Sequence, residues 1–189
     1  MDVKVCHFTT AHNIDDVRIF TKQCTSLAAN GFDVTLIAFG DDEFEDVKNG
    51  VKRISLNVPV KNRIERFIKR SKVVYNKLLE VNADIYHFHD PELFFVGLKL
   101  KKIGKKVIFD AHEDFPKQIL QKTYIPKFIR KPISMFAGVI DKIIFLKFDS
   151  IVTTTPSITS KYKNYGCESV EIRNYPILNN TNIINWDQK

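Results

Sequence analysis

The sequence predicts an α/β fold in which a Rossmann-like, doubly wound parallel sheet lies between two layers of helices, α/β/α. Short apolar runs bounded by turn residues alternate with stretches of helical periodicity along the chain. Within these runs, residues that would point to either face of a strand are apolar, as is typical of strands covered on both faces. A length of 189 residues also allows one sizeable core. Alternating strands and helices are typical of a parallel sheet with helices on both faces.

The first half of the chain carries four predicted strands and two predicted helices. We expect the strands at residues 3–9, 33–39, 51–56 and 84–88. The helices are expected at residues 16–30 and 62–81, and Gly31 follows the first one where a C-terminal cap would lie. An acidic loop, residues 41–46, separates the second strand from the third.

The second half continues the alternation. Helices are predicted at residues 91–102, 127–147 and 156–165, and strands at 106–109, 150–153 and 170–173. Asp90 and Thr155 precede prolines at helix starts, which is typical of N-caps. In the long helix, we expect one apolar face to point inward, formed by Ile129, Ile133, Phe136, Ile140 and Ile143 or Ile144.

The charge distribution and the cysteines indicate which partners and which cellular compartment to expect. The net charge is +7, with basic stretches at residues 61–77 and 117–131. These stretches favour an anionic partner such as a phosphorylated lipid or a membrane surface, or they are solvated helix faces. No nucleic-acid-binding motif accompanies them, so no nucleic-acid partner is expected. The three widely spaced cysteines favour reduced thiols and a cytoplasmic protein.

Three histidines follow predicted strand ends, each near acidic residues, whereas His7 and His87 lie within strands and are expected in the core. The loop after the first strand holds His12, Asp16 and Arg18. The loop after the fourth strand holds His89 and Asp90, and the one after the fifth holds Asp110, His112, Glu113 and Asp114. Ligands bind at the carboxyl ends of parallel strands. If the first strand neighbours the fourth, and the fourth the fifth, these loops meet in one crevice.

Other interpretations of these residues stay open. Asp90 and Asp16 can serve as helix caps, with Arg18 pairing locally, and His89 can be a buried histidine. His87-x-His89-Asp90 resembles a hydrolase metal motif, but no further histidine cluster completes a ligand shell, so we expect no metal. No glycine-rich loop follows the first strand, and neither a Walker A loop nor a Gly-x-Ser-x-Gly elbow occurs.

Several segments resemble the N-terminal, acceptor-side domain of GT-B glycosyltransferases of the family-4 type. The resemblance lies in residues 16–20, 27–37, 84–90, 107–113 and 174–176, in the expected order over nearly the whole chain. The Asp-Ala-His-Glu segment at 110–113 is the most specific of them. The resemblance implies a metal-independent transfer with retention of anomeric configuration. It also implies that His112 is catalytic and that His12, Asp16, Arg18, His89, Asp90 and Glu113 bind substrate.

The chain departs from the complete family pattern. The resemblance implies a second, donor-binding domain with two glutamates eight residues apart, and no pair of glutamates here has that spacing. We therefore expect residues 1–177 to form the acceptor-side domain, residues 178–189 to start an interdomain linker, and the donor-binding domain to be absent. On this hypothesis the chain alone is inactive, and whether residue 189 is a natural end stays open.

The resulting hypothesis is half of a retaining glycosyltransferase that uses a nucleotide-sugar and a glycan or polyprenyl-linked acceptor, in surface polysaccharide biosynthesis. No cofactor is expected, and the basic helices allow peripheral contact with the inner face of the membrane. One alternative is a non-catalytic binding module that docks to a separate donor-binding chain through apolar surface on helix 127–147. Another is a stand-alone nucleotide-sugar enzyme such as an epimerase.

Overall fold

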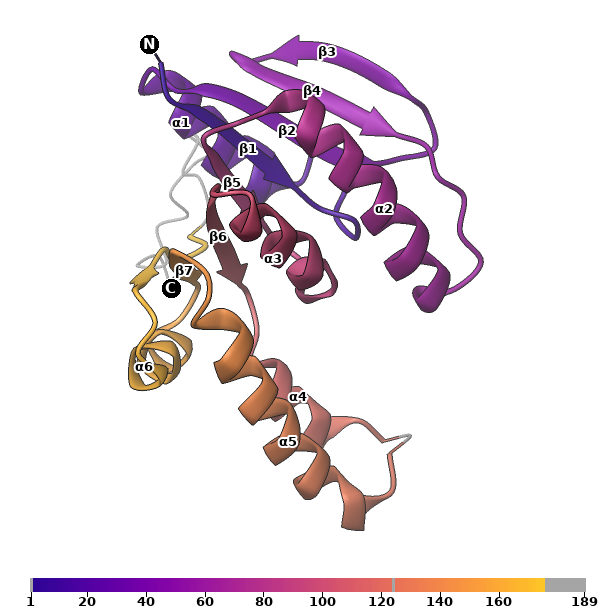
Figure 1. Ribbon diagram of the computed structural model, residues 1–189, viewed down its shortest axis with the longest axis vertical. Helices are drawn as coiled ribbons and strands as arrows, with labels where there is room; N and C mark the ends of the chain where they lie inside the picture. The colour runs from indigo at the N-terminus through magenta and orange to yellow at the C-terminus, as the bar shows by residue number, and fades with distance from the viewer. Residues whose placement is uncertain (1, 124, 176–189) are drawn as a thin grey trace, which may run out of the picture.

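The computed structural model describes residues 2–123 and 125–175. Its centre is an eight-stranded sheet with the order β3-β4-β2-β1-β5-β6-β7-β8 (Figure 1). All neighbouring strands are parallel except β3 and β4. The strands are β1 (Lys4–Phe8), β2 (Asp33–Phe39), β3 (Phe44–Lys48), β4 (Val51–Leu56), β5 (Ile85–Phe88), β6 (Lys106–Ala111), β7 (Ser150–Thr153) and β8 (Ser169–Glu171). The predicted linker at 178–189 lies outside the described residues.

Helical segments connect the parallel strands. They are η1 (Val17–Cys24), α1 (Thr25–Ala29), α2 (Arg63–Val81), η2 (Pro91–Leu93), α3 (Phe94–Lys102), α4 (Phe115–Gln121), α5 (Lys127–Phe145) and α6 (Pro156–Tyr165). The predicted first helix is therefore two segments, because its first eight residues adopt π-helical geometry before α1 begins. Gly31 follows α1 with φ +85°, as the C-terminal cap prediction requires.

Two apolar clusters, one on each side of the sheet, confirm the predicted three layers. Alternate residues of a strand point to opposite faces. On β2, Ile37 and Phe39 join the larger cluster with side chains of α2, α3, α5 and α6. Leu36 and Ala38 join the smaller cluster with side chains of η1. The same alternation places Phe8 in the larger cluster and His7 on the side of the sheet that faces η1.

The strand order reverses at β1. From β1 the chain adds β2 and β4 on one side, and β5 to β8 on the other. The crossovers leaving β1 and β5 consequently diverge and open a crevice beyond the carboxyl ends of these strands, where open α/β sheets bind ligands. β5 lies between β1 and β6, so the arrangement required for the three histidine-bearing loops to meet is present.

Several segments correct the sequence-based expectations. Part of the acidic loop forms the antiparallel edge strand β3, on which Asp46 pairs with Arg53 and Glu45 with Lys52. Asp46 lies directly opposite Arg53 in the β3–β4 ladder, and Glu45 is diagonal to Lys52. Both pairs of opposite charge stabilise a strand whose own composition is poor in β-formers. Strand β6 extends two residues further than predicted, so that Asp110 lies within it. The segment after β6 contains α4 rather than only a loop.

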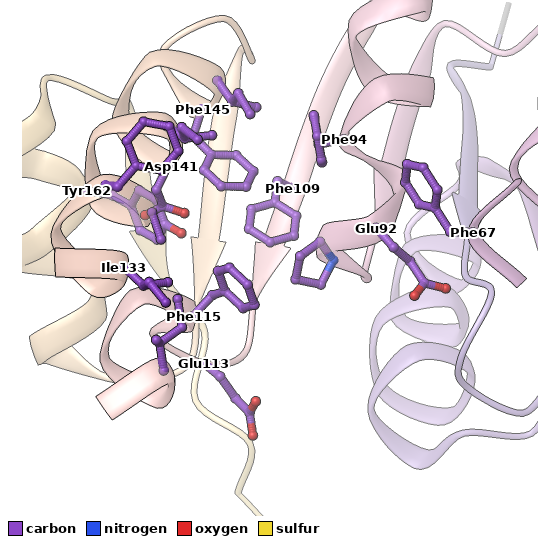
Figure 2. A pocket seen from close by; sticks show the side chains of 16 residues that line it. Phe67, Glu92, Phe94, Phe109, Glu113, Phe115, Ile133, Asp141, Phe145 and Tyr162 are labelled. Atoms are coloured by element: carbon purple, nitrogen blue, oxygen red, sulfur yellow. The ribbon is translucent and has the colours of Figure 1, made fainter. Parts of the chain in front are cut away.

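The long helix α5 does not bury its predicted apolar face. Ile133, Phe136 and Ile140 are 38%, 68% and 39% exposed, and Ile143 is also exposed. Only the end of α5 around Phe145 reaches the sheet, whereas the rest pairs with α4 and extends away from the body of the domain (Figure 1). Side chains of this helix pair and of helices α2 and α3 line an apolar cavity between them that is open on one side, where Phe115 and Phe136 are exposed (Figure 2).

None of the helices in the described part of the chain combines the length and hydropathy that crossing a bilayer requires. Cys6 and Cys24 are fully buried in the two apolar clusters, as predicted for reduced core cysteines.

Candidate functional site

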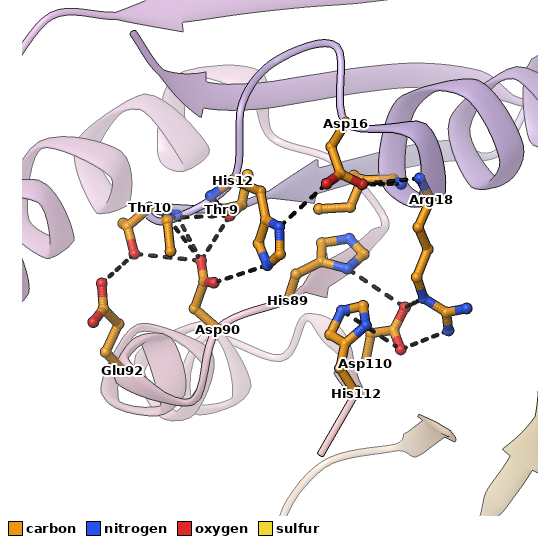
Figure 3. A network of polar contacts seen from close by, with 12 residues as sticks. Thr9, Thr10, His12, Asp16, Arg18, His89, Asp90, Glu92, Asp110 and His112 are labelled. Carbon is orange, nitrogen blue, oxygen red and sulfur yellow. Dashed lines mark hydrogen bonds and ion pairs between the residues drawn. The ribbon is translucent and has the colours of Figure 1, made fainter. Parts of the chain in front are cut away.

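A polar cavity of about 340 Å³ lies at the carboxyl ends of β5 and β6, next to the loop that follows β1 (Figure 3). It is lined by His12, His89, Asp90, Pro91, Phe109, Asp110, His112, Glu113, Phe115 and Gln118. Five of the seven residues predicted from the sequence therefore line one cavity: His12, His89, Asp90, His112 and Glu113. Asp16 and Arg18 stand behind the wall and contact residues that form it.

All five histidines of the chain form one continuous array of rings. The ring centroids are 4.5 Å apart for His7 and His87, 4.8 Å for His87 and His89, 5.9 Å for His89 and His112, and 5.7 Å for His112 and His12. His7 and His87 are buried in their strands as predicted, and both rings pack against the ring of His89. The Nδ1 atom of His7 lies 3.0 Å from Nε2 of His89, so one of these nitrogens donates a hydrogen bond to the other.

Burial keeps the inner imidazoles neutral. It lowers the pKa of His87 to about 3, and the neighbouring His89 adds to this effect. Burial, followed by the proximity of His87, lowers the pKa of His7 well below its usual value. The pKa of His112 is also lowered, mainly by burial, although Asp110 opposes the shift. Near neutral pH, these three rings therefore each hold one proton and can accept a hydrogen bond through the other nitrogen.

Asp110 is the central carboxylate of the site, and the predicted site residues did not include it. The Arg18 guanidinium donates two hydrogen bonds to it, from Nε to Oδ2 at 3.3 Å and from Nη2 to Oδ1 at 2.9 Å. Gln23 Nε2 also donates to Oδ2, at 2.6 Å. Asp110 is fully buried. The expectation that Arg18 pairs locally is wrong, because its partner lies 92 positions away on β6.

The histidines surround this carboxylate. Asp110 oxygens lie 3.5 Å from Nδ1 of His89, 3.9 Å from Nε2 of His112 and 4.0 Å from Nε2 of His87. Burial would raise the pKa of Asp110, but interactions with His89, His87 and His112 outweigh it and hold the pKa well below its usual value. Asp110 is thus an ionised carboxylate, and it orients imidazoles at the base of the cavity.

Asp90 holds the loop after β1 against the loop after β5. Its Oδ2 accepts hydrogen bonds from the Thr9 hydroxyl at 2.7 Å and the Thr10 amide at 2.6 Å. Asp90 occupies the N-cap position of η2, but its side chain makes no capping hydrogen bond there. The expected cap role is therefore wrong, because the loop amide and hydroxyl of the neighbouring crossover use the carboxylate instead.

His12 closes the cavity from the β1 side. Its Nδ1 lies 3.3 Å from Asp16 Oδ2, and its Nε2 lies 3.6 Å from Asp90 Oδ1. Asp16 also caps η1 by accepting from the Arg18 and Ile19 amides, each at 2.9 Å, so the cap interpretation is confirmed. Although burial opposes it, the amide of Ile19 and the nearby His12 lower the pKa of Asp16.

Glu113 is exposed at the rim, where its carboxylate accepts from Gln118 of α4. Glu92, which was not predicted, accepts from the Thr10 hydroxyl at 2.6 Å and from Arg66 of α2 at 2.8 Å. Its position after β5 was visible in the sequence. Its pairing with α2 was not, because that contact depends on how the helix crosses the sheet.

Among the described residues, two groups of side chains could offer metal ligands. They are His7 with His87 and His89, and His89 with Asp110 and His112, each group having candidate ligand atoms within 4.8 Å of one another. His7 thus adds the third histidine that the sequence pattern lacked. Competing contacts oppose metal binding, because His7 and His89 bond each other and the Arg18 cation already occupies Asp110. The expectation of a metal-free site remains a prediction.

The cavity provides groups suited to binding a hydroxylated ligand. Neutral imidazoles, buried carboxylates and a partly exposed His12 can donate to and accept from sugar hydroxyls. Within residues 2–123 and 125–175, Nδ1 of His89 and Nε2 of His112 are buried without a hydrogen-bond partner. Buried polar atoms are normally paired, and both nitrogens face Asp110, at 3.5 and 3.9 Å, so they extend the contacts around this carboxylate.

Residues 17–174 match the sequence model of Glycosyltransferase Family 4, and the chain belongs to this family. The expected likeness to the N-terminal domain of a GT-B enzyme is confirmed by the fold. No curated protein sequence matches the chain.

Solved structures share the fold at low sequence identity. Sucrose-phosphate synthase from Thermosynechococcus elongatus has a TM-score of 0.64 at 14% identity, over 90% of this chain and 48% of that one. A trehalose-6-phosphate structure from E. coli bound with UDP-2-fluoro glucose has a TM-score of 0.53 at 12% identity, over 85% and 42%. UDP-GlcNAc 2-epimerase from Methanocaldococcus jannaschii has a TM-score of 0.55 at 12% identity, over 88% and 43%. The chain thus spans about half the length of these proteins.

Proposed function

We propose that this chain forms the acceptor side of a retaining glycosyltransferase, which transfers a sugar from a nucleotide-sugar to a glycan or lipid-linked acceptor in surface polysaccharide biosynthesis. The observation that carries the proposal is the polar cavity at the strand-order reversal, in a chain that belongs to Glycosyltransferase Family 4. A second, donor-binding domain would lie across this cavity. This chain covers only 48% and 42% of two structural neighbours, which supports a division of the enzyme into an acceptor-side and a donor-binding domain.

In this proposal His112 is the catalytic residue. Its ring borders the cavity, and a lowered pKa keeps it neutral, so that it can contact a hydroxyl of the transferring sugar without adding a charge. His89, Asp90, His12 and Glu113 bind the acceptor. Asp110 and Arg18 position His112 and His89 rather than touching substrate.

The test is sugar transfer by an enzyme that combines this chain with its donor-binding domain. We expect His112→Ala to lower kcat/KM by about 10²- to 10³-fold, the usual loss when one group that stabilises the transition state is removed. The circular dichroism spectrum should not change. A matched control is Lys163→Ala on α6, an exposed residue outside the cavity, which should leave transfer unchanged. Near-normal turnover of the His112→Ala variant would exclude the catalytic role.

Peripheral contact with a cytoplasmic membrane face is part of the proposal. Lys127 and Lys131 lie exposed on α5, beside exposed apolar residues that include Phe128 at 81%. Such a mixture of basic and apolar side chains suits an anionic lipid surface. In contrast, Lys69, Lys77 and Arg66 of the α2 stretch pair with glutamates, so this stretch offers less free charge.

Two other functions have specific support. The similarity in fold to the M. jannaschii UDP-GlcNAc 2-epimerase favours a nucleotide-sugar enzyme as the second candidate. The exposed apolar face of α5 favours a non-catalytic module that docks to a donor-binding chain. Binding of UDP-GlcNAc by this chain alone would favour the first, and a stable complex with a donor-binding protein without any transfer would favour the second.

A further inference from the structure

The apolar cavity of about 570 Å³ adjoins the polar cavity (Figure 2). Phe67 of α2 and Phe94 of α3 form one wall, Ile133 and Phe145 of α5 lie opposite, and Phe109 of β6 stands between them. The cavity is within the size range of small-ligand sites, and its lining is largely aromatic and branched aliphatic.

Two of the three carboxylates that line this cavity are paired with cations of the protein, and the third, Glu113, also lines the polar cavity. Glu92 receives two hydrogen bonds of 2.8 Å from Arg66, and Asp141 lies 2.6 Å from Nζ of Lys161. These pairs occupy acceptor positions of both carboxylates and leave the cavity without free negative charge from them. The cavity is thus suited to an apolar group rather than to a second sugar.

The two cavities share part of their walls. Pro91, Phe109, Glu113 and Phe115 line both of them. One ligand can therefore place an apolar part among the phenylalanines and a polar part beside His12 and His112. At the mouth, Phe136 and Ile140 of α5 remain exposed, so that an apolar chain longer than the cavity would stay in contact with protein.

We propose that the apolar cavity binds the hydrocarbon chain of an amphipathic acceptor whose hydroxylated head lies in the polar cavity. This inference rests on the proposed function, and it selects a lipid-linked acceptor over a free glycan. The shared wall and the pairing of Glu92 and Asp141 with cations of the protein carry it. Each methylene buried in such a site strengthens binding by about fourfold.

The test is calorimetric titration of the 189-residue chain with n-alkyl β-glucosides of four to about twelve carbons, each kept below its micelle concentration. We expect the Kd to fall with each added methylene until the cavity is filled, and glucose alone to bind weakly. Ala137 lines the cavity, so Ala137→Phe should weaken binding of the longest alkyl glucoside at least about tenfold by filling the space. Val139→Phe, on the exposed side of the same helix, is the matched control and should leave the Kd unchanged.

A Kd that does not depend on chain length, or equal loss in both phenylalanine variants, would overturn the inference. If Ala137→Phe does not fold, Ile140→Glu at the exposed mouth replaces it and should also weaken chain binding. Elution as a dimer that alkyl glucosides do not dissociate would assign the cavity to a second copy of the chain instead.

The outcome separates this inference from the proposed function. Chain-length-dependent binding with normal transfer by the His112→Ala enzyme would leave the hydrocarbon site standing and remove the catalytic assignment. Loss of transfer in His112→Ala, together with a Kd that does not depend on chain length, would keep the catalytic assignment and remove the hydrocarbon site.

Discussion

Arg18 and Asp110, 92 residues apart in the chain, form a buried ion pair in which the guanidinium contacts both carboxylate oxygens at 3.3 and 2.9 Å. Arg18 comes from η1, on the layer that covers one face of the sheet, and Asp110 comes from β6. The pair therefore ties the first crossover to β6, the strand that directly precedes His112, and it sets the base of the polar cavity.

Removing one partner of this pair should destabilise the fold. Arg18→Ala leaves an uncompensated buried carboxylate, so we expect a loss of about 3–5 kcal/mol in the free energy of unfolding, measured by urea denaturation. The double variant Arg18→Met/Asp110→Leu removes both charges and should recover most of that loss. A loss below about 1 kcal/mol in Arg18→Ala would mean that the pair is not held as described.

Asp90 should stabilise the loop after β1. Asp90→Ala leaves the Thr9 hydroxyl and the buried Thr10 amide without their acceptor, which we expect to cost about 1–3 kcal/mol in the free energy of unfolding. Asp90→Asn keeps one oxygen at the same place and should lose less. Amide hydrogen exchange of residues 9–12 should accelerate in Asp90→Ala, and unchanged protection there would contradict the assigned contacts.

Stability should fall as the pH is lowered from 7.5 towards 5. His7, His87 and His112 have pKa values below those of unfolded histidines, so below about pH 6.5 the unfolded chain binds protons that the folded chain does not. The free energy of unfolding then decreases by up to about 1.4 kcal/mol per pH unit for each of these histidines.

Denaturation series at several pH values measure this slope, and His87→Asn should flatten it by about one proton. Asp110 also lowers the free energy of unfolding as the pH falls, but only in stronger acid. Its pKa in the folded protein is lowered, so the stability that the ionised carboxylate contributes is lost only below the usual pKa of an aspartate. A free energy of unfolding that is constant between pH 7.5 and 5 would contradict neutral, buried histidines.

The sequence predicts the fold well because the periodicity of its apolar residues is strong. The parallel sheet, the helix 62–81 and the meeting of three loops all follow from alternation and from the usual strand order. The edge strand β3 was missed because the acidic composition of residues 41–46 indicated a loop, although Asn49-Gly50, with positive φ at both positions, is the local signal of a two-residue hairpin turn. The ion pair of Asp46 with Arg53 across this hairpin stabilises the strand.

The candidate site was predictable in its histidines, whereas Asp110 was expected only as one of the acids after a strand end and not as the central carboxylate. His12, His89 and His112 are visible as histidines after strand ends, next to acids. Asp110 lies in the predicted loop, and only its position in β6 shows that it faces Arg18 and Gln23 rather than solvent. The exposure of α5 could not be predicted, because helical periodicity identifies an apolar face without identifying what covers it.

The division of labour between acceptor and donor sides is the central claim, and titration calorimetry of this 189-residue chain with UDP, GDP and their sugars tests it most directly. The proposed acceptor-side domain predicts no detectable heat from any of these ligands, with circular dichroism verifying that the protein is folded. Saturable, tight binding of one nucleotide or nucleotide-sugar would contradict the claim and make this chain a nucleotide-binding unit in its own right.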